Sequence, residues 1–353
     1  MKIGDRYIGA PSDVYVIAEL GVNHDGSVQR ALEMVDAAAE AGADAVKTQW
    51  FEAERLMSKA SRLAGYQQAA GERDPAEMLR RLQLSRDEMT RVVYRARSRN
   101  IHAIVTVFSH DLVEEAARLG WDAYKTASPD IVHRPLLEAL LGTGKPMILS
   151  TGAATLEEVV RATDWVSAAR DRLAVLQCVS CYPTRPEHAS LGGIRAVADA
   201  TRLPAGYSDH TAEEDTGAAA VALGARILEK HFTYDRAAKG PDHSASLDPA
   251  GFARYVRHAR AACVEPPPIS PTDPRLGQRE KRVLECEQDV RTVSRQSIVT
   301  RRKIRKGGVL TLEDLTFKRP GLGLPPFDLA RVVGLRATRD LEIDTPLSGE
   351  DIA

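Results

Sequence analysis

Short hydrophobic runs alternate along most of the chain with longer stretches in which apolar residues recur every three to four positions. The short runs are rich in β-branched residues and are typical of buried strands, whereas the longer spacing is typical of amphipathic helices. This pattern predicts eight strands, at residues 14–20, 43–49, 102–108, 123–128, 146–151, 173–178, 205–210 and 227–232. Helices are predicted between and after them, at residues 28–41, 86–98, 112–119, 135–141, 156–169, 191–200, 213–223 and 249–262.

The alternation of strands and helices indicates the fold class. Eight strand–helix units in about 250 residues are what closes a barrel of parallel strands, so we predict an α/β protein with a (β/α)₈ TIM barrel. The interval from Gln49 to Arg86 is too long for a plain crossover. We therefore expect an extra helix or loop there.

The composition of the sequence changes after the strand–helix pattern of the barrel ends. Residues 264–275 read VEPPPISPTDPR, and this density of proline predicts an extended linker. From about residue 291, short β-prone runs are interrupted by glycine and proline, which predicts a small, mostly β domain. The predicted domains are a catalytic barrel at 1–263, a linker at 264–290 and the small domain at 291–353.

Charge and cysteine content exclude several classes of protein. The 353 residues carry 48 Lys and Arg and 49 Asp and Glu, so a general nucleic-acid-binding role is not expected. Within this balance, residues 290–353 hold 12 basic and 8 acidic residues, which makes the C-terminal part mildly basic and the barrel mildly acidic. We also expect no membrane span, no secretion signal and no disulfide framework, and hence a cytoplasmic protein.

Two lysines at predicted strand ends are the first candidates for chemistry. Reactive side chains of such barrels come from the C-terminal ends of the strands. Lys47 and Lys125 stand there within otherwise apolar runs, although the chain has only 11 lysines. Because a buried ammonium group is costly without an anionic partner, we predict that the two lysines bind an anion.

Serines and histidines at other strand ends extend this site. His210 and His231 end neighbouring strands, and a histidine pair suits a divalent ion such as Mn²⁺ or Zn²⁺. Hydroxyl groups together with lysines suit a phosphate or a carboxylate. The serine hydroxyls at strand ends belong to Ser128, Ser150, Ser180 and Ser208.

Eight segments of the chain together form a recognisable pattern. They are IAELGVNHDGS (17–27), AGADAVKTQWF (41–51), YKTASPD (124–130), LSTGAAT (149–155), QCVSCYPTRP (177–186), GYSDHT (206–211), EKHFTYDRAAKGPDHSASLDP (229–249) and IRKGGVLTLEDLTFKRPGLG (304–323). In this order they resemble one known family, the sialic acid (N-acetylneuraminate) synthases with their legionaminic and pseudaminic acid relatives. The C-terminal segment is similar to the antifreeze-like domain of those enzymes, also called the SAF domain, which is a β-clip fold.

The resemblance implies a transferase of nonulosonic acid biosynthesis. Such an enzyme condenses phosphoenolpyruvate with an open-chain N-acetylhexosamine and water, and phosphate leaves with C–O cleavage. The resemblance further implies a divalent metal, Mn²⁺ or Mg²⁺, and a domain-swapped homodimer in which each SAF domain caps the barrel of its partner. An arginine that matches Arg319 would then enter from that partner.

The resemblance also implies roles for single residues. The metal ligands would be His210 and His231, and the acid–base candidates Glu19 and Asp130 are not ranked by the sequence. Contacts to phosphoenolpyruvate would come from Lys47, Lys125, Ser128, Ser150, Ser180 and Ser208. Contacts to the sugar would come from Gln49, Asp130, Tyr182, Asp242 and Arg319.

Departures from the family pattern leave the sugar open. Position 180 is serine where well-known sialic acid synthases have asparagine, and position 130 is aspartate where some members have glutamate. The acceptor could therefore be N-acetylmannosamine, a 2,4-diacetamido-trideoxyhexose or an unusual sugar of a specialised pathway. A different chemistry, a Schiff-base pyruvate aldolase with Lys125 as the nucleophile, is the alternative.

Overall fold

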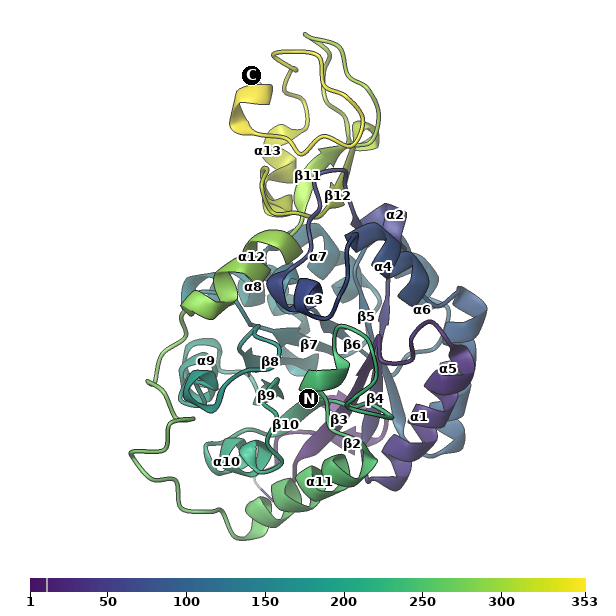
Figure 1. Cartoon of the computed structure of the whole chain (residues 1–353). Coiled ribbons are helices and arrows are strands. Elements are labelled where there is room, and N and C mark those ends of the chain that lie inside the picture. The colour runs from purple at the N-terminus through teal and green to yellow at the C-terminus, as the bar shows by residue number, and fades with distance from the viewer. Residues whose placement is uncertain (11) are drawn as a thin grey trace.

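The computed structural model describes residues 1–10 and 12–353. Its larger part is a closed barrel of eight parallel strands, which confirms the predicted fold class (Figure 1). The strands follow one another around the barrel in chain order, and the last pairs with the first. They are β3 (Tyr15–Gly21), β4 (Ala45–Trp50), β5 (His102–Val107), β6 (Ala123–Thr126), β7 (Met147–Ser150), β8 (Leu173–Cys178), β9 (Ala205–Asp209) and β10 (Ile227–His231).

Helices surround the barrel on its outer face. The long interval after β4 holds three short helices, as expected, namely α2 (Ala53–Leu56), α3 (Gly65–Ala69) and α4 (Pro75–Leu82). The helices that follow the strands are α1 (Val28–Glu40), α5 (Arg86–Ser98), α6 (Val113–Ala117), α7 (Arg134–Gly142), α8 (Leu156–Trp165), α9 (Gly193–Thr201), α10 (Thr216–Ala222) and α11 (Pro249–Val264).

Local sequence signals determine where several of these helices begin. The side chains of Ser27 and Asp248 accept backbone N–H groups in the first turns of α1 and α11. Ser85 and Thr155 form capping boxes with Glu88 and with a glutamate of α8. Such caps satisfy N–H groups that the helix itself leaves without a partner.

Several predicted strands are shorter than expected, and the fourth is one of them. The fourth barrel strand ends at Thr126, and residues Ser128–Val132 form a 3₁₀ turn instead of continuing the run to residue 128. Pro129 lies in this turn, and proline has no N–H group to donate to a neighbouring strand. The turn carries Ser128 and Asp130 at the barrel end.

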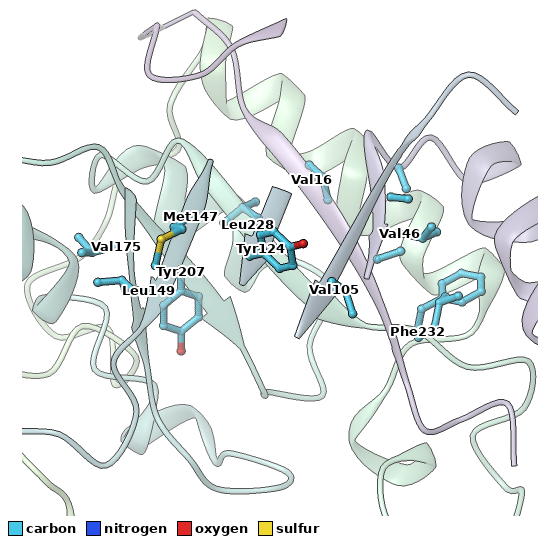
Figure 2. Close-up of a cluster of buried hydrophobic side chains, with 14 of the residues drawn as sticks. Val16, Val46, Val105, Tyr124, Met147, Leu149, Val175, Tyr207, Leu228 and Phe232 are labelled. Atoms are coloured by element: carbon cyan, nitrogen blue, oxygen red, sulfur yellow. The ribbon is translucent and has the colours of Figure 1, made fainter. Parts of the chain in front are cut away.

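The core has two layers because side chains alternate along each strand. Outward-facing residues such as Val16, Val46, Val105 and Leu149 pack beneath the surrounding helices, and Figure 2 shows part of this layer. A second, smaller cluster fills the interior of the barrel, with Ile17, Ala45, Ile104, Ala123, Ile148, Leu176 and Ile227 among its members. The barrel thus has a packed apolar core, and polar residues lie at the ends of its strands.

The C-terminal part is a small separate layer at one end of the barrel (Figure 1). Residues 265–284 form turns and extended segments, after which a 3₁₀ turn (Glu285–Glu287) leads into α12 (Gln288–Ser294). The C-terminal domain follows, with the antiparallel pair β11 (Ser297–Thr300) and β12 (Leu315–Lys318) and the short helix α13 (Leu329–Val332). It has its own apolar cluster around Ile298, Leu310 and Leu341.

The N-terminal residues form a short hairpin of β1 (Lys2–Ile3) and β2 (Arg6–Tyr7), whose Ile3 belongs to the interior cluster of the barrel. Among the described residues, no helix is both long and apolar enough to cross a bilayer.

Candidate active site

The inward-facing positions of the barrel strands change from apolar to polar toward the strand ends. On β3, Ile17 of the interior cluster is followed two residues later by Glu19, and on β4 Ala45 is followed by Lys47. A period of two keeps such a pair on one face of the strand. The polar layer produced in this way comprises Glu19, Lys47, Lys125, Ser150, Ser208 and Glu229.

These polar ends open into one cavity of about 120 Å³, which the turn and helix residues after the strands close. Three of the residues expected at the site, Asp130, Ser150 and Ser208, do not line the cavity. Among them, Ser150 accepts a hydrogen bond from Ser128, and Ser208 donates one to Glu229. The expected residues that line the cavity itself are Glu19, Lys47, Gln49, Lys125, Ser128, Ser180, Tyr182, His210, His231, Asp242 and Arg319.

Two lysines and two glutamates form a buried ionic cluster at the floor of the cavity. Lys47 Nζ lies 2.7 Å from Glu19 Oε2 and 3.9 Å from Glu229 Oε2, and it donates to Thr106 Oγ1 at 3.0 Å. Lys125 Nζ lies 2.8 Å from Glu229 Oε1. Each ammonium group thus has the anionic partner that its burial requires.

The pKa values of the two glutamates shift in opposite directions. Burial raises the pKa of Glu19, and the nearby Lys47 ammonium does not fully offset this. Burial alone would raise the pKa of Glu229 as well, but the ammonium groups of Lys125 and Lys47 outweigh it and lower the pKa to about 2. The surroundings of Glu229 therefore favour its ionised form, whereas Glu19 is the better candidate of the two for exchanging a proton.

A serine-lined edge lies beside this cluster. The Gly152 N–H and the Ser150 hydroxyl both contact the Ser128 hydroxyl, at 2.9 and 3.0 Å. The Ser180 hydroxyl is buried and has no partner among the described residues. A Cβ on Gly152 would lie 2.2 Å from Ser180 Oγ and 2.8 Å from Ser128 Oγ, so only glycine leaves room for these hydroxyls. Hydroxyl donors around an open space next to two lysines suit an oxyanion.

The two histidines lie together where the neighbouring strands β9 and β10 end. The ring centroids of His210 and His231 are 5.4 Å apart, and the Tyr182 ring packs on His210 at 4.2 Å. His210 Nδ1 contacts the Val179 carbonyl oxygen at 2.7 Å, which leaves Nε2 available. Burial, and then the neighbouring His210, hold the pKa of His231 well below its usual value, so its ring is neutral.

This pair satisfies part of what a metal site requires. The neutral ring of His231 suits a borderline divalent ion, and the backbone carbonyl oxygen at His210 Nδ1 directs Nε2 of that ring away from the backbone. Burial lowers the pKa of His210, but the neighbouring Cys178 outweighs it and raises the pKa, so an ion here would have to displace a proton from that ring. The described residues contain no group of three or more His, Cys, Asp or Glu side chains that could hold a metal. An ion here would complete its coordination with water or substrate oxygens, as open catalytic sites do.

Buried carboxyl groups line or adjoin the rest of the cavity. Burial raises the pKa of Asp130 to about 7, although the Arg319 guanidinium favours its ionised form. Burial and the charge of Glu19 raise the pKa of Asp242 to about 7. Gln49 donates to Glu19 Oε1 at 2.9 Å and so orients that carboxyl group. Carboxyl groups with a pKa near 7 can donate or accept a proton at neutral pH.

Arg319 reaches this cavity from the C-terminal domain of the same chain. It follows β12 and pairs with Met57 in a parallel bridge, and its N–H donates to the Leu56 carbonyl oxygen at 2.9 Å. The hydroxyl groups of Ser58 and Ser61 both donate to the Arg319 carbonyl oxygen. These contacts lie within one chain, and the entry of this arginine from a partner, which the resemblance implies, stays a prediction.

Sequence reasoning missed two acidic residues of this region. Glu229 could have been found, because it lies two residues after Ile227 and two before His231 on the same face of one strand. Glu287 had no such signal, since it lies beyond the proline-rich segment and contacts the barrel only through the tertiary fold.

Comparisons with known proteins agree with this architecture. Residues 34–265 match the NeuB family and residues 295–353 match the SAF domain. An N,N'-diacetyllegionaminic acid synthase of Legionella pneumophila is 36% identical over 98% of this chain and 96% of its own length. The chain therefore belongs to the NeuB family, whose similar members are named synthases, and it is an enzyme of this class that ends in a SAF domain.

Solved structures extend the likeness to the whole chain. The spore coat polysaccharide biosynthesis protein spsE of Bacillus subtilis superposes with a TM-score of 0.87 at 31% identity, covering 100% of this chain and 99% of that one. An N-acetylneuraminic acid synthetase of Leptospira borgpetersenii, solved with citrate, gives a TM-score of 0.67 at 30% identity over 82% of this chain and 94% of its own.

Proposed function

We propose that this enzyme condenses phosphoenolpyruvate with the aldehyde of an open-chain N-acetylated amino sugar to form a nonulosonic acid and phosphate. The observation that carries the proposal is the juxtaposition of an anion site and a histidine pair at one barrel end. Lys47, Lys125 and the serine-lined edge supply the anion site. Membership of the NeuB family supports the same chemistry.

The proposed reaction forms one carbon–carbon bond at carbon 3 and one carbon–oxygen bond from water at carbon 2, and it breaks the carbon–oxygen bond between carbon 2 and the phosphate. Carbon 3 of phosphoenolpyruvate attacks carbon 1 of the sugar aldehyde, water adds at carbon 2, and phosphate leaves. The two ammonium groups hold the substrate carboxylate and phosphate, and the hydroxyl donors meet the charge on the leaving group. Glu19 and Asp130 are the candidates for moving protons to the new alkoxide and from the water, because both have a raised pKa.

His210 and His231 are the residues proposed to hold a divalent cation, Mn²⁺ or Mg²⁺. When bound, such an ion would act as a Lewis acid on the aldehyde. The contact of His210 Nδ1 with the Val179 carbonyl oxygen supports this role, because it fixes the ring and directs Nε2 away from the backbone.

The walls of the cavity favour an acceptor with apolar substituents. Beside the polar floor, the lining includes Val22, Phe51, Met78, Leu79 and Phe108. The lysine and arginine side chains that line the cavity are those of Lys47, Lys125 and Arg319. Because the proposal assigns the two lysines to phosphoenolpyruvate, Arg319 is the one that can contact the sugar. We therefore propose an unphosphorylated acceptor with acetamido or deoxy groups, such as a 2,4-diacetamido-trideoxyhexose, ahead of a sugar phosphate.

Release of inorganic phosphate tests this proposal. Phosphoenolpyruvate is incubated with a panel of 2-acetamido and 2,4-diacetamido aldoses, with and without a chelator. Release that depends on one acceptor and is lost on chelation is expected. No release with any acceptor would contradict the condensation, and turnover indifferent to chelation would contradict the role of the metal.

The geometry argues against the Schiff-base alternative. A nucleophilic lysine must lose its proton, and burial does favour the neutral amine of Lys125. The Glu229 carboxylate at 2.8 Å outweighs burial, however, and raises the pKa of Lys125. Borohydride in the presence of pyruvate should therefore trap no adduct on the wild-type enzyme.

A further inference from the structure

The segment that joins the barrel to the C-terminal domain enters the wall behind the serine-lined edge. Glu287 ends the 3₁₀ turn there, and its side chain has no exposed surface. Its Oε1 accepts the backbone N–H groups of Ala153 at 2.6 Å and Ser180 at 2.7 Å. Its Oε2 accepts the N–H of Leu284 at 2.9 Å, which fixes the carboxylate within its own turn.

The two barrel peptides that Glu287 holds belong to neighbouring loops of the anion site. Ala153 follows Gly152 in the loop after β7, and Ser180 lies in the loop after β8. Across the gap between these loops, a Cβ on Gly152 would lie only 2.2 Å from Ser180 Oγ. One carboxylate oxygen therefore determines how far apart the two loops stand where the hydroxyl groups converge.

Other side chains of the joining segment hold the same loops. Lys281, which is 6% exposed, donates to the Cys178 carbonyl oxygen at 3.1 Å, two residues before Ser180. Arg295 of the segment just after α12 donates to the Ala153 carbonyl oxygen at 3.2 Å and to Glu158 of α8 at 2.8 Å. Glu287, Lys281 and Arg295 thus hold the two loops from the same side of the barrel.

We propose that Glu287 is a positioning residue for phosphoenolpyruvate, acting through the backbone of Ala153 and Ser180. The inference rests on the proposed function, since it assigns the serine-lined edge to the phosphate of that substrate. Loss of the carboxylate would release both N–H groups and let the loops separate. The Ser128 and Ser180 hydroxyls would then no longer meet one phosphate group.

Binding of phosphoenolpyruvate in the absence of sugar is the primary test, with calorimetry as the measurement. In Glu287→Ala the dissociation constant should rise about 10- to 100-fold, because two hydrogen bonds to a charged acceptor are lost. Glu287→Gln keeps one acceptor oxygen and should lie between the wild type and the alanine variant. Glu285→Ala, which changes an exposed residue of the same turn, should bind as the wild type does.

Steady-state kinetics separate positioning from mere stability. The KM for phosphoenolpyruvate should rise with the dissociation constant, whereas the KM for the sugar should stay within about twofold of the wild type. Unchanged binding of phosphoenolpyruvate by folded Glu287→Ala, or an equal rise in both KM values, would overturn the inference. Should the alanine variant not fold, Glu287→Gln decides, and binding equal to the wild type would overturn it. A wild-type enzyme that binds no phosphoenolpyruvate would instead refute the proposed function.

Discussion

At the scale of single residues, four charged side chains set what the floor of the cavity can bind. Glu229 stays ionised between Lys47 and Lys125, so part of the positive charge is neutralised before any substrate enters. Glu19 has a raised pKa and contacts Lys47. A multiply charged anion beside it would favour its protonated form and release Lys47 for the substrate.

Gly152 allows a residue-scale prediction about the space between the hydroxyl groups. Gly152→Ala should abolish measurable binding of phosphoenolpyruvate, because the new methyl group would overlap the Ser180 and Ser128 hydroxyls. Gly142→Ala is the control, since a Cβ there meets nothing within 4 Å. Calorimetric titration with phosphoenolpyruvate compares the two variants, and normal binding by Gly152→Ala would show that the serine-lined edge is not where the phosphate lies.

Asp130 allows a prediction about stability and pH. Its folded-state pKa of about 7 lies above the ~3.9 of an unfolded chain, so folding favours the protonated form. The stability that this provides is complete below pH ~4 and is lost as the pH rises through about 7. Asp130→Asn should therefore stabilise the protein more at pH 9 than at pH 5, by about 1–3 kcal/mol.

Denaturant unfolding of wild type and Asp130→Asn at the two pH values measures this difference. Asp111→Asn is the control with the opposite sign, because a hydrogen bond to His110 and the Arg301 charge lower the pKa of Asp111 to about 2 despite its partial burial. Its effect should not turn into a gain at pH 9. Equal effects of Asp130→Asn at both pH values would contradict the shifted pKa.

At the scale of elements, helix α12 and strand β12 connect the C-terminal domain to the barrel in different ways. Arg291 and Arg295 both bind Glu158 of α8, so α12 is held on the outside of the barrel (Figure 1). The chain after β12 instead joins the insertion after β4 through main-chain contacts at Met57 and Arg319. The first attachment fixes the anion site, and the second delivers a cation to the side of the cavity proposed for the sugar.

The placement of Arg319 after β12 leads to a prediction about substrate affinity. Arg319→Ala should raise the KM for the sugar by about tenfold or more while changing the KM for phosphoenolpyruvate little. Arg331→Ala, on the exposed surface of the same domain, is the control and should leave both values unchanged. Initial rates with each substrate varied in turn measure the split, and equal changes in both KM values would contradict a role at the sugar.

At the scale of the whole molecule, the cavity is small and is bordered by three parts of the chain outside the barrel strands. Its volume of about 120 Å³ is smaller than the ~300–1,000 Å³ typical of ligand sites, and it must accommodate two substrates. The barrel strands are packed on both faces, so the walls made by the insertion after β4, α12 and the C-terminal domain are the parts that can move. A movement of one of these walls would widen the cavity for substrates, and its return would exclude water from the reaction.

Mixing two impaired variants, assayed at a sugar concentration well below the KM of Arg319→Ala, tests which chain supplies the arginine. The resemblance predicts a homodimer with each SAF domain on the partner's barrel, whereas the contacts of Arg319 lie within one chain. Chains carrying Lys47→Ala and chains carrying Arg319→Ala are unfolded, mixed and refolded together, and phosphate release is measured. Closure within one chain predicts no recovery above the separate variants. Recovered activity would instead demonstrate a domain-swapped dimer.

The sequence by itself determined the barrel and most of its polar layer, because both depend on local periodicity. Strands of period two and helices of period 3.6 can be recognised from neighbouring residues. Once the strands are known, the convergence of Lys47, Lys125, His210 and His231 at one end follows from their being parallel. Even Glu229 was accessible to this reasoning through its spacing from Ile227.

Only the tertiary structure decided how charges pair and what supports the site. Glu287 lies 134 residues along the chain from Ala153, Arg295 lies 137 from Glu158, and Arg319 lies 261 from Ser58. No local pattern encodes such contacts, because they depend on where a proline-rich segment of irregular conformation returns to the barrel. The chemistry of the strand ends could therefore be predicted from the sequence, whereas the contacts of Glu287 with the two loops and of Arg319 with the insertion after β4 could not.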